Sequence, residues 1–291
     1  MTLLFALVFL YAFNLKQELK EKKAALEGVR KHAPGVKLCL GHCAPQFCIP
    51  FMREKFPKKL FDAFGWDSPQ FERMAERPPR AVETNLVYFA NKERQELGYG
   101  DIEAVHLESY FPSSHRLALG HRVQADNTVR TAVLSLALGS DRFLSCWTLH
   151  DCEDYWGTQH YGCVGVIGRA PEFNPKPAAA AFATMTQLLD SSQYDGFLKT
   201  GSHTAYCVRF KKADELVYCL WTVRGSRDMT LSVAEGADLT LVNENGNETK
   251  LQPGGGAARV AITPTPVWIV ARGAEIQAAQ CGPVTHTEAP G

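Results

Sequence analysis

Apolar and polar positions in the first 190 residues switch repeatedly between two patterns. Helical spacing of apolar residues predicts helices over residues 3–32, 82–97, 119–138 and 174–192. Short apolar runs that precede turn residues or polar loops predict strands over residues 36–44 and 60–71, and a strand with its following loop over residues 102–112 and 141–151. Strands that alternate with helices at this spacing are typical of parallel βαβ units. Residues 1–192 are therefore expected to form an α/β domain.

The pattern changes after Ser192. Residues 193–273 consist of short segments rich in β-branched and aromatic residues, separated by turn residues such as Asn245-Gly246. This pattern predicts an antiparallel β-sandwich domain. The remaining residues, 274–291, are expected to be a disordered tail.

The chain opens with an apolar run from Leu3 to Phe13. The run is too short to cross a bilayer. No Lys or Arg precedes it and no small-x-small cleavage site follows, so a signal peptide is the less favoured interpretation. We expect it to be the buried part of the helix over residues 3–32. No membrane partner is predicted, and a cytoplasmic location is slightly favoured.

Composition and charge exclude several classes of protein. The 291 residues carry 31 Lys and Arg against 31 Asp and Glu, which gives no electrostatic footprint for nucleic acid. Hydrophobic residues make up 45% of the chain, enough for a packed core. The length would suit a complete (β/α)8 barrel. The pattern in the last third of the chain, however, predicts strands only, so a barrel in this chain would be incomplete.

Three of the nine cysteines lie close together in sequence, at Cys39, Cys43 and Cys48, with His42 between them. Their spacing matches no standard zinc pattern, and no second CxxC pair is present. Scattered thiols are therefore the favoured interpretation, and no cofactor is predicted. A metal-dependent enzyme that uses His42 and these cysteines stays open as a weaker alternative.

A polar or aromatic residue ends each of the four predicted strands. These residues are His42, Asp67, Glu108 and Trp147. In parallel α/β folds, functional side chains gather at the carboxyl ends of strands. Taken singly, Glu108 fits a solvated loop equally well, and a tryptophan is more often a core residue. Together the four predict a polar, aromatic-lined pocket.

Asp151 follows the fourth predicted strand and is expected either to hydrogen-bond a hydroxyl-rich ligand or to cap the loop. The chain contains no GxxxxGK[ST], GxGxxG, GxSxG or HExxH motif. Their absence counts against nucleotide-binding enzymes, serine hydrolases with a nucleophile elbow, and zinc proteases.

Several segments occur in a familiar order. LFDAFGWDSPQF precedes HLESYFP, CWTLHD, NPKPAAAAFATMTQLL and finally ITPTPVWI. This succession over residues 20–272 resembles the carboxyl-terminal half of retaining glycoside hydrolases with a (β/α)8 barrel and a trailing β-sandwich, of the xylosidase/iduronidase-like type. The resemblance implies a partial barrel, strands five to eight, and a carbohydrate substrate.

The resemblance also implies roles for individual residues. Glu108 matches the catalytic nucleophile and Trp147 the aromatic platform beneath the sugar. Tyr110 is placed to contact the nucleophile. Asp67 stands where these families carry a His-x-Tyr motif, so the sequence departs from the pattern there. This departure leaves the substrate open.

The second catalytic carboxyl group has no counterpart in the expected place. In these families the acid/base glutamate ends the fourth strand, usually in an Asn-Glu pair, and no such pair precedes the helix over residues 3–32. Retaining hydrolysis needs two carboxyl groups. The chain is therefore expected to be a fragment whose acid/base lies upstream of Met1. The alternative is a non-catalytic carbohydrate-binding or interaction remnant of the same fold.

Overall fold

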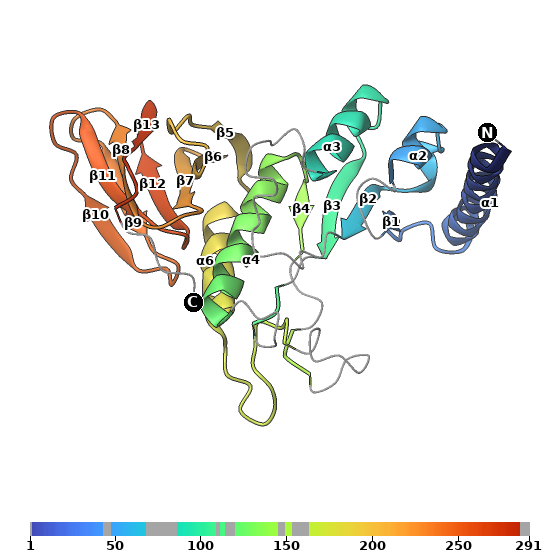
Figure 1. The fold of residues 1–291 in the computed structure, drawn as a ribbon, viewed down its shortest axis with the longest axis horizontal. Coiled ribbons are helices and arrows are strands. Elements are labelled where there is room, and N and C mark those ends of the chain that lie inside the picture. Colours follow the sequence, from blue (N-terminus) through green and yellow to red (C-terminus); the bar gives the residue numbers. More distant parts are fainter. Residues whose placement is uncertain are drawn as a thin grey trace. The chain divides into compact units, whose positions relative to one another are not determined.

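A computed structural model describes residues 2–42, 48–67, 86–108, 111–113, 120–144, 149–152 and 163–285. The side chains of residues 2–15, 42, 67, 86 and 108 lie outside this description. The chain divides into two compact units, coloured along the sequence in Figure 1. The first unit comprises residues 1–68, 82–108 and 138–144, and the second comprises residues 69–81, 109–137 and 145–291.

The first unit is built on a parallel sheet with the order β1-β2-β3-β4. The strands are β1 (Cys39–His42), β2 (Ala63–Asp67), β3 (Glu103–Glu108) and β4 (Arg142–Phe143). The helices are α1 (Thr2–His32), α2 (Cys48–Arg53), η2 (Lys58–Leu60) and α3 (Leu86–Glu96). The predicted alternation of strands and helices is thus confirmed, and the first three strands lie within their predicted ranges.

One face of this sheet is buried under aromatic side chains. Leu40, Phe64 and Ala104 stand in register on β1, β2 and β3, and all three are buried. Phe64 packs edge-on against Phe61, with ring centroids 4.8 Å apart, and against Tyr99. Alternation along the strands therefore places the next row of residues, Gly41, Gly65 and Val105, on the opposite face.

The start of β4 is held beside β3 by a buried arginine. Arg94 of α3 donates to the carbonyl of Gly139 at 3.2 Å and contacts Asp141 Oδ2 at 3.3 Å. The same Asp141 oxygen accepts a hydrogen bond from the backbone N–H of Ala104 at 2.7 Å. A side chain from the covering helix thus sets where the fourth strand joins the sheet.

The fourth strand lies at the start of its predicted range. β4 ends at Phe143, and residues 145–148 lie outside the described part. Residues 149–151 belong to the second unit, where His150 forms a parallel bridge with Ile167. β4 thus lies within the range predicted for the fourth strand and its loop, while the predicted strand end at Trp147 lies outside the described residues.

The second unit contains α4 (Gly120–Ala137), α6 (Pro177–Leu189) and two antiparallel sheets. The larger sheet has the order β10-β9-β12-β7-β6-β5 and the smaller one β11-β8-β13. The strands are β5 (Gln193–Phe197), β6 (Ala205–Lys212), β7 (Glu215–Thr222), β8 (Arg227–Ser232), β9 (Asp238–Val242), β10 (Glu248–Leu251), β11 (Ala257–Ile262), β12 (Val267–Arg272) and β13 (Ala278–Cys281). The predicted antiparallel, sandwich-like β-structure is present.

Apolar residues from both antiparallel sheets form one core. Leu220 of β7 and Ile269 of β12 in the larger sheet, and Met229 and Leu231 of β8 in the smaller one, are fully buried in it. Non-local strand pairing and this shared core stabilise the sandwich.

The expectation of a disordered tail from residue 274 needs correction. Ile276 is fully buried in the sandwich core, and β13 pairs with β8 along its whole length. The sequence of β13, AAQC, has a weak strand propensity, so the pattern along the chain does not predict this strand. Burial of Ile276 and Ala279 stabilises the strand instead. Residues 286–291 lie outside the described part of the chain.

Helix α4 carries a buried polar face within the second unit. Arg122 donates to Thr265 Oγ1 from Nε at 3.1 Å and from Nη2 at 2.8 Å. Arg130 donates to the carbonyl of Pro264 at 3.1 Å. Asp126 is 5% exposed beside these groups. Its burial raises the pKa of the carboxyl group to about 6, although Arg130 and Thr265 act in the opposite direction.

Asp126→Asn is expected to stabilise the protein above pH 6. The native state holds the Asp126 proton up to about pH 6, whereas the unfolded chain loses it near pH 4, so the parent loses stability as pH rises through this window. We expect the variant to exceed the parent by about 3 kcal/mol at pH 7.5 and to match it below pH 4. Urea unfolding across this pH range measures the difference, and a difference that does not change with pH would contradict the assignment.

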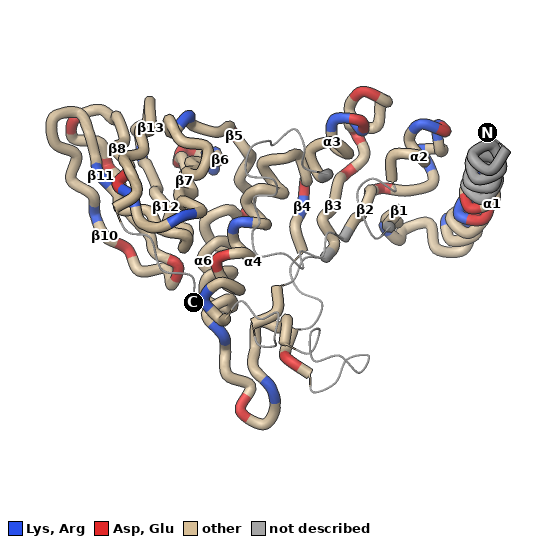
Figure 2. The backbone as a smooth tube through the Cα atoms, in the orientation of Figure 1, with Lys and Arg blue, Asp and Glu red and all other residues tan. Residues whose placement is uncertain are grey.

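Charges of both signs are interspersed along the described parts of both units, as Figure 2 shows. In the described part of the chain, no helix combines the length and the apolar character that crossing a bilayer requires.

Candidate functional site

The carboxyl ends of β1, β2 and β3 bring three of the predicted site residues to one edge of the parallel sheet. His42 is the last residue of β1, Asp67 of β2 and Glu108 of β3. Neighbouring strands in a sheet lie about 4.8 Å apart. The backbone therefore places these positions at adjacent strand ends, as the sequence predicts.

The register separates His42 from the two acidic positions. His42 stands opposite Trp66, in the row that continues to His106. Trp66 and His106 are both 1% exposed. Asp67 stands opposite Glu108, one row nearer to the carboxyl edge. Asp67 and Glu108 are thus direct neighbours across the ladder, whereas His42 shares the row of two buried residues.

A register shift creates the pairing of Asp67 with Glu108. Up to Trp66 and His106 the two strands advance together, and an unshifted ladder would next pair Asp67 with Leu107. The ladder instead skips Leu107. Such bulges redirect the following side chain and are common next to active sites. The sequence pattern VHLE gives no sign of this shift.

Small and apolar residues occupy the strand positions just before His42, Asp67 and Glu108. Gly41 and Gly65 are Cα partners on β1 and β2. Leu107 lies over them and keeps 36% exposure. These residues form an apolar surface that can contact the C–H face of a sugar ring.

The cysteines near this edge do not form a recognisable metal site. In the described residues, no group of three or more His, Cys, Asp or Glu side chains is placed to hold a metal ion. Burial, and secondarily Glu103, raises the pKa of the Cys39 thiol to about 11, so this sulfur is not a thiolate at neutral pH. The buried Cys48 thiol contacts the carbonyl of Gly65 at 3.7 Å. Cys43 lies outside the described residues.

Asp151 lies in the second unit, where it pairs with a buried lysine. Lys176 Nζ donates to Asp151 Oδ1 at 2.7 Å, to Ser113 Oγ at 2.9 Å and to the carbonyl of Cys163 at 3.2 Å. The backbone N–H of Gly165 also donates to Asp151 Oδ1, at 3.0 Å. We call Lys176, Asp151, Ser113 and Cys163 the Lys176 cluster. These contacts give Asp151 a structural role, while its contact with a sugar stays a prediction.

The structure thus brings Asp67 and Glu108 together and places Asp151 elsewhere. Tyr110 and Trp147 lie outside the described residues, so their roles stay predictions. Sequence reasoning missed Lys176. The available signal was its position between Pro175 and Pro177 at the start of α6, where an ordinary helix cap would be Ser, Thr, Asp or Asn.

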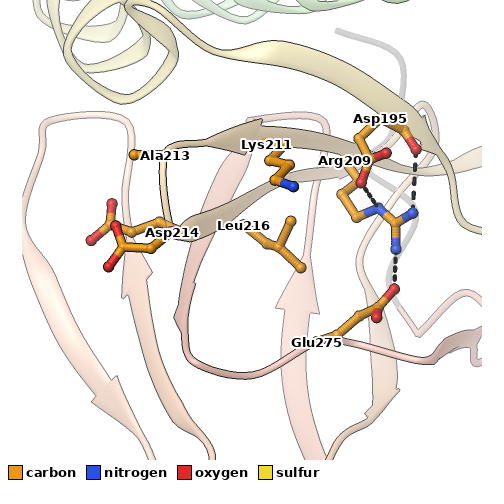
Figure 3. Close-up of a pocket in the computed structure, with 8 residues that line it drawn as sticks. Asp195, Arg209, Lys211, Ala213, Asp214, Leu216 and Glu275 are labelled. Carbon is orange, nitrogen blue, oxygen red and sulfur yellow. Dashed lines mark hydrogen bonds and ion pairs between the residues drawn. The ribbon is translucent and has the colours of Figure 1, made fainter.

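A hollow of about 560 Å³ lies on the β-sandwich and is shown in Figure 3. Arg209 of β6 points between Asp195 and Glu275 and pairs with both, with a distance of 2.8 Å from its Nε to Asp195 Oδ2. Glu215, another lining residue, pairs with Arg272 at 2.6 Å. The carboxylates of Asp195, Glu275 and Glu215 are thus engaged with protein cations, and the residues that line the hollow include none of the predicted site residues.

No family model matches the chain, and no curated protein matches its sequence. Solved structures resemble it in fold. A family 39 glycoside hydrolase from Bacteroides cellulosilyticus WH2 aligns with a TM-score of 0.61 at 19% identity, over 79% of this chain and 48% of that chain. A family 30 endoxylanase from Clostridium papyrosolvens C71 aligns with a TM-score of 0.58 at 9% identity, over 83% of this chain and 57% of that one.

A third similar structure is the family 30 subfamily 8 xylanase from Clostridium acetobutylicum, with a TM-score of 0.57 at 9% identity, over 87% of this chain and 59% of that one. The chain thus spans about half the length of the solved structures it resembles. At these identities the likeness concerns the fold alone. The expectation of a glycoside hydrolase fold is confirmed in this general form.

Proposed function

We propose that this chain is the carboxyl-terminal half of a retaining glycoside hydrolase of the xylosidase/iduronidase-like type, with Glu108 as its nucleophile. The observation that carries the proposal is the register. Glu108 ends a parallel strand at the carboxyl edge of the sheet, directly opposite Asp67, in a chain with a glycoside hydrolase fold. The carboxyl edge of such sheets is where glycosidases of this architecture place their catalytic carboxylates.

In the proposed reaction the Glu108 carboxylate attacks the anomeric carbon of the sugar. A glycosyl–enzyme ester forms, the glycosidic C–O bond breaks, and the leaving oxygen takes a proton from an acid/base carboxyl group. Water then attacks the anomeric carbon and gives its proton to the acid/base. The ester breaks and Glu108 returns as a carboxylate. Two inversions leave the anomeric configuration unchanged.

Asp67 suits a supporting role in this reaction. Its position beside Glu108 brings a second negative charge to the place where the sugar develops positive charge in the oxocarbenium-like transition state. It also provides an acceptor for sugar hydroxyl groups. His42, Tyr110, Trp147 and Asp151 remain proposed substrate-binding residues.

The acid/base is assigned to a barrel strand beyond the four described here. Retaining enzymes hold their two carboxyl groups about 5–5.5 Å apart, on opposite sides of the scissile bond. In the resembling families these groups come from strands on different sides of a closed barrel. We therefore propose that the four-stranded sheet is half of a (β/α)8 barrel. The aligned share of the solved structures, about half of each, supports this.

Trapping the covalent intermediate tests the proposal. The full-length gene product is incubated with 2-deoxy-2-fluoro glycosyl fluorides of xylose, glucose and related sugars, and the labelled peptide is identified by mass spectrometry. We expect one glycosyl group on Glu108, and none on that peptide in Glu108→Gln. Labelling at another carboxylate, or no labelling with any sugar of the panel, would overturn Glu108 as the nucleophile.

The alternative function is a carbohydrate-binding protein without catalysis. Sugar binding by calorimetry, combined with no covalent trapping, would identify this function.

A further inference from the structure

The missing side chain of Gly65 provides space for two neighbouring side chains. A Cβ atom built on Gly65 would lie 2.5 Å from Cys39 Sγ and 2.9 Å from Leu107 Cγ, and closer still to Leu107 Cδ1. Carbon and sulfur atoms do not approach this closely, so any side chain at position 65 would displace both neighbours. Gly41, the Cα partner of Gly65, adds room next to it, since its Cβ would lie 3.3 Å from Leu107 Cδ1.

Backbone conformation does not explain these two glycines. Neither Gly41 nor Gly65 has a positive φ. Both lie in regular strand positions within a parallel ladder. Glycine weakens a strand interior and often marks a close approach of another group. Here the approaching group is the side chain of Leu107.

Leu107 is also the residue that the β2–β3 ladder skips. Leu107 therefore both fills the space beside Gly65 and is the residue at which the register shifts. In an unshifted ladder, Leu107 would occupy the place opposite Asp67 that Glu108 now holds. A shift of one residue moves a position from one face of a sheet to the other.

We infer that Gly65 and Leu107 are positioning residues, which together fix the register shift that places Glu108 opposite Asp67. The catalytic part of this role rests on the proposed function, whereas the register itself can be tested without activity. The sheet edge alone would allow Asp67 to pair with Leu107. The space left by Gly65 favours the shifted pairing, because the Leu107 side chain fills it.

The first test reads the register by cross-linking. Disulfides form between residues whose Cα atoms are about 4.4–6.8 Å apart, a range that suits opposite positions on neighbouring strands. The double variant Asp67→Cys/Glu108→Cys, which retains Leu107, is made in the full-length gene product. After mild oxidation, peptide mapping by mass spectrometry separates the 67–108 disulfide from those of the native cysteines.

We expect the 67–108 disulfide to form about tenfold faster than in the same pair carrying Gly65→Ala, a difference of about 1.4 kcal/mol. Equal rates with and without Gly65→Ala would overturn the role of the contact between Leu107 and Gly65. Gly35→Ala is the matched control, because a Cβ there meets nothing within 4 Å.

The second test measures the rate at which the fluoro sugar labels Glu108. We expect Gly65→Ala to slow labelling about 100-fold, since a displacement of about 1 Å at a reacting group has this effect. Leu107→Ala is expected to slow labelling by a similar factor, and Gly65→Ala/Leu107→Ala to slow it no further, because both substitutions remove the same contact. This lack of additivity distinguishes positioning from general destabilisation, and additive losses would overturn the role of the Leu107 contact.

The two tests separate failure of this inference from failure of the proposed function. If Glu108 is never labelled but formation of the 67–108 disulfide depends on Gly65, the register role stands and the nucleophile assignment fails. If Glu108 is labelled but Gly65→Ala changes neither the formation of this disulfide nor the rate of labelling, the positioning role fails alone.

Discussion

Lys176→Met is expected to lower the free energy of unfolding of the second unit by about 3–5 kcal/mol. Lys176 is 5% exposed and Asp151 is 7% exposed, so their ion pair is shielded from water. Methionine has a similar length but cannot donate hydrogen bonds. It would leave the buried carboxylate of Asp151 without its countercharge and would also remove the donor to Ser113 Oγ and the Cys163 carbonyl.

Urea unfolding of Lys176→Met, followed by circular dichroism, measures this loss. Lys250→Met is the matched control, because Lys250 pairs with Asp238 on the exposed surface, where such pairs contribute less than about 1 kcal/mol. Adding Asp151→Asn to Lys176→Met removes the stranded charge and should restore about 1–2 kcal/mol. Equal losses in Lys176→Met and Lys250→Met would show that the Lys176 cluster stabilises the protein no more than an exposed ion pair does.

The Lys176 cluster joins chain segments that are far apart in sequence. Ser113 lies five residues after Glu108, and Asp151 lies four residues after Trp147. One lysine at the start of α6 therefore anchors the chain shortly after each of two proposed site residues. Loss of this anchor is expected to affect catalysis in addition to stability, and the two effects separate when labelling is measured well below the unfolding midpoint.

Periodicity and turn chemistry were sufficient to predict most helices and strands from the sequence. The helices α1, α3, α4 and α6 are found within or close to their predicted ranges because their apolar spacing and their stop residues agree. β13 was missed because AAQC has little strand preference of its own, and the buried Ile276 beside it supplies the stability. Tertiary contacts thus decide the elements with weak local signals.

The candidate site was predictable only as far as strand ends can be read from a sequence. Regular alternation along VHLE would place Glu108 on the same face of the sheet as His106, which is buried. The structure departs from this alternation at Leu107, because a glycine on the neighbouring strand makes room for that side chain. A contact between two strands that lie 40 residues apart is invisible to a pattern read along one of them. Lys176 was missed for the same reason, since its partners come from three other segments.

Glu108→Ala is expected to slow the release of dinitrophenolate from an activated dinitrophenyl glycoside by about 10⁴-fold. This leaving group needs no proton, so the assay reports attack by the nucleophile without depending on the acid/base. Alanine removes the carboxylate and leaves room for a small anion in its place. Glu103→Ala is the matched control on the same strand, because Glu103 begins β3 at its opposite end, and its rate is expected to stay within about threefold of the parent.

Sodium azide distinguishes a lost nucleophile from a damaged site. In Glu108→Ala, azide takes the place of the carboxylate, attacks the anomeric carbon and displaces dinitrophenolate, which gives a glycosyl azide of inverted configuration. We expect azide to restore at least tenfold of the lost rate in Glu108→Ala and to leave Glu103→Ala unchanged. Proton NMR of the product gives the configuration at the anomeric carbon. A rescued product of retained configuration would mean that another group attacks the sugar, and Asp67, the register neighbour of Glu108, would then be the first residue to replace.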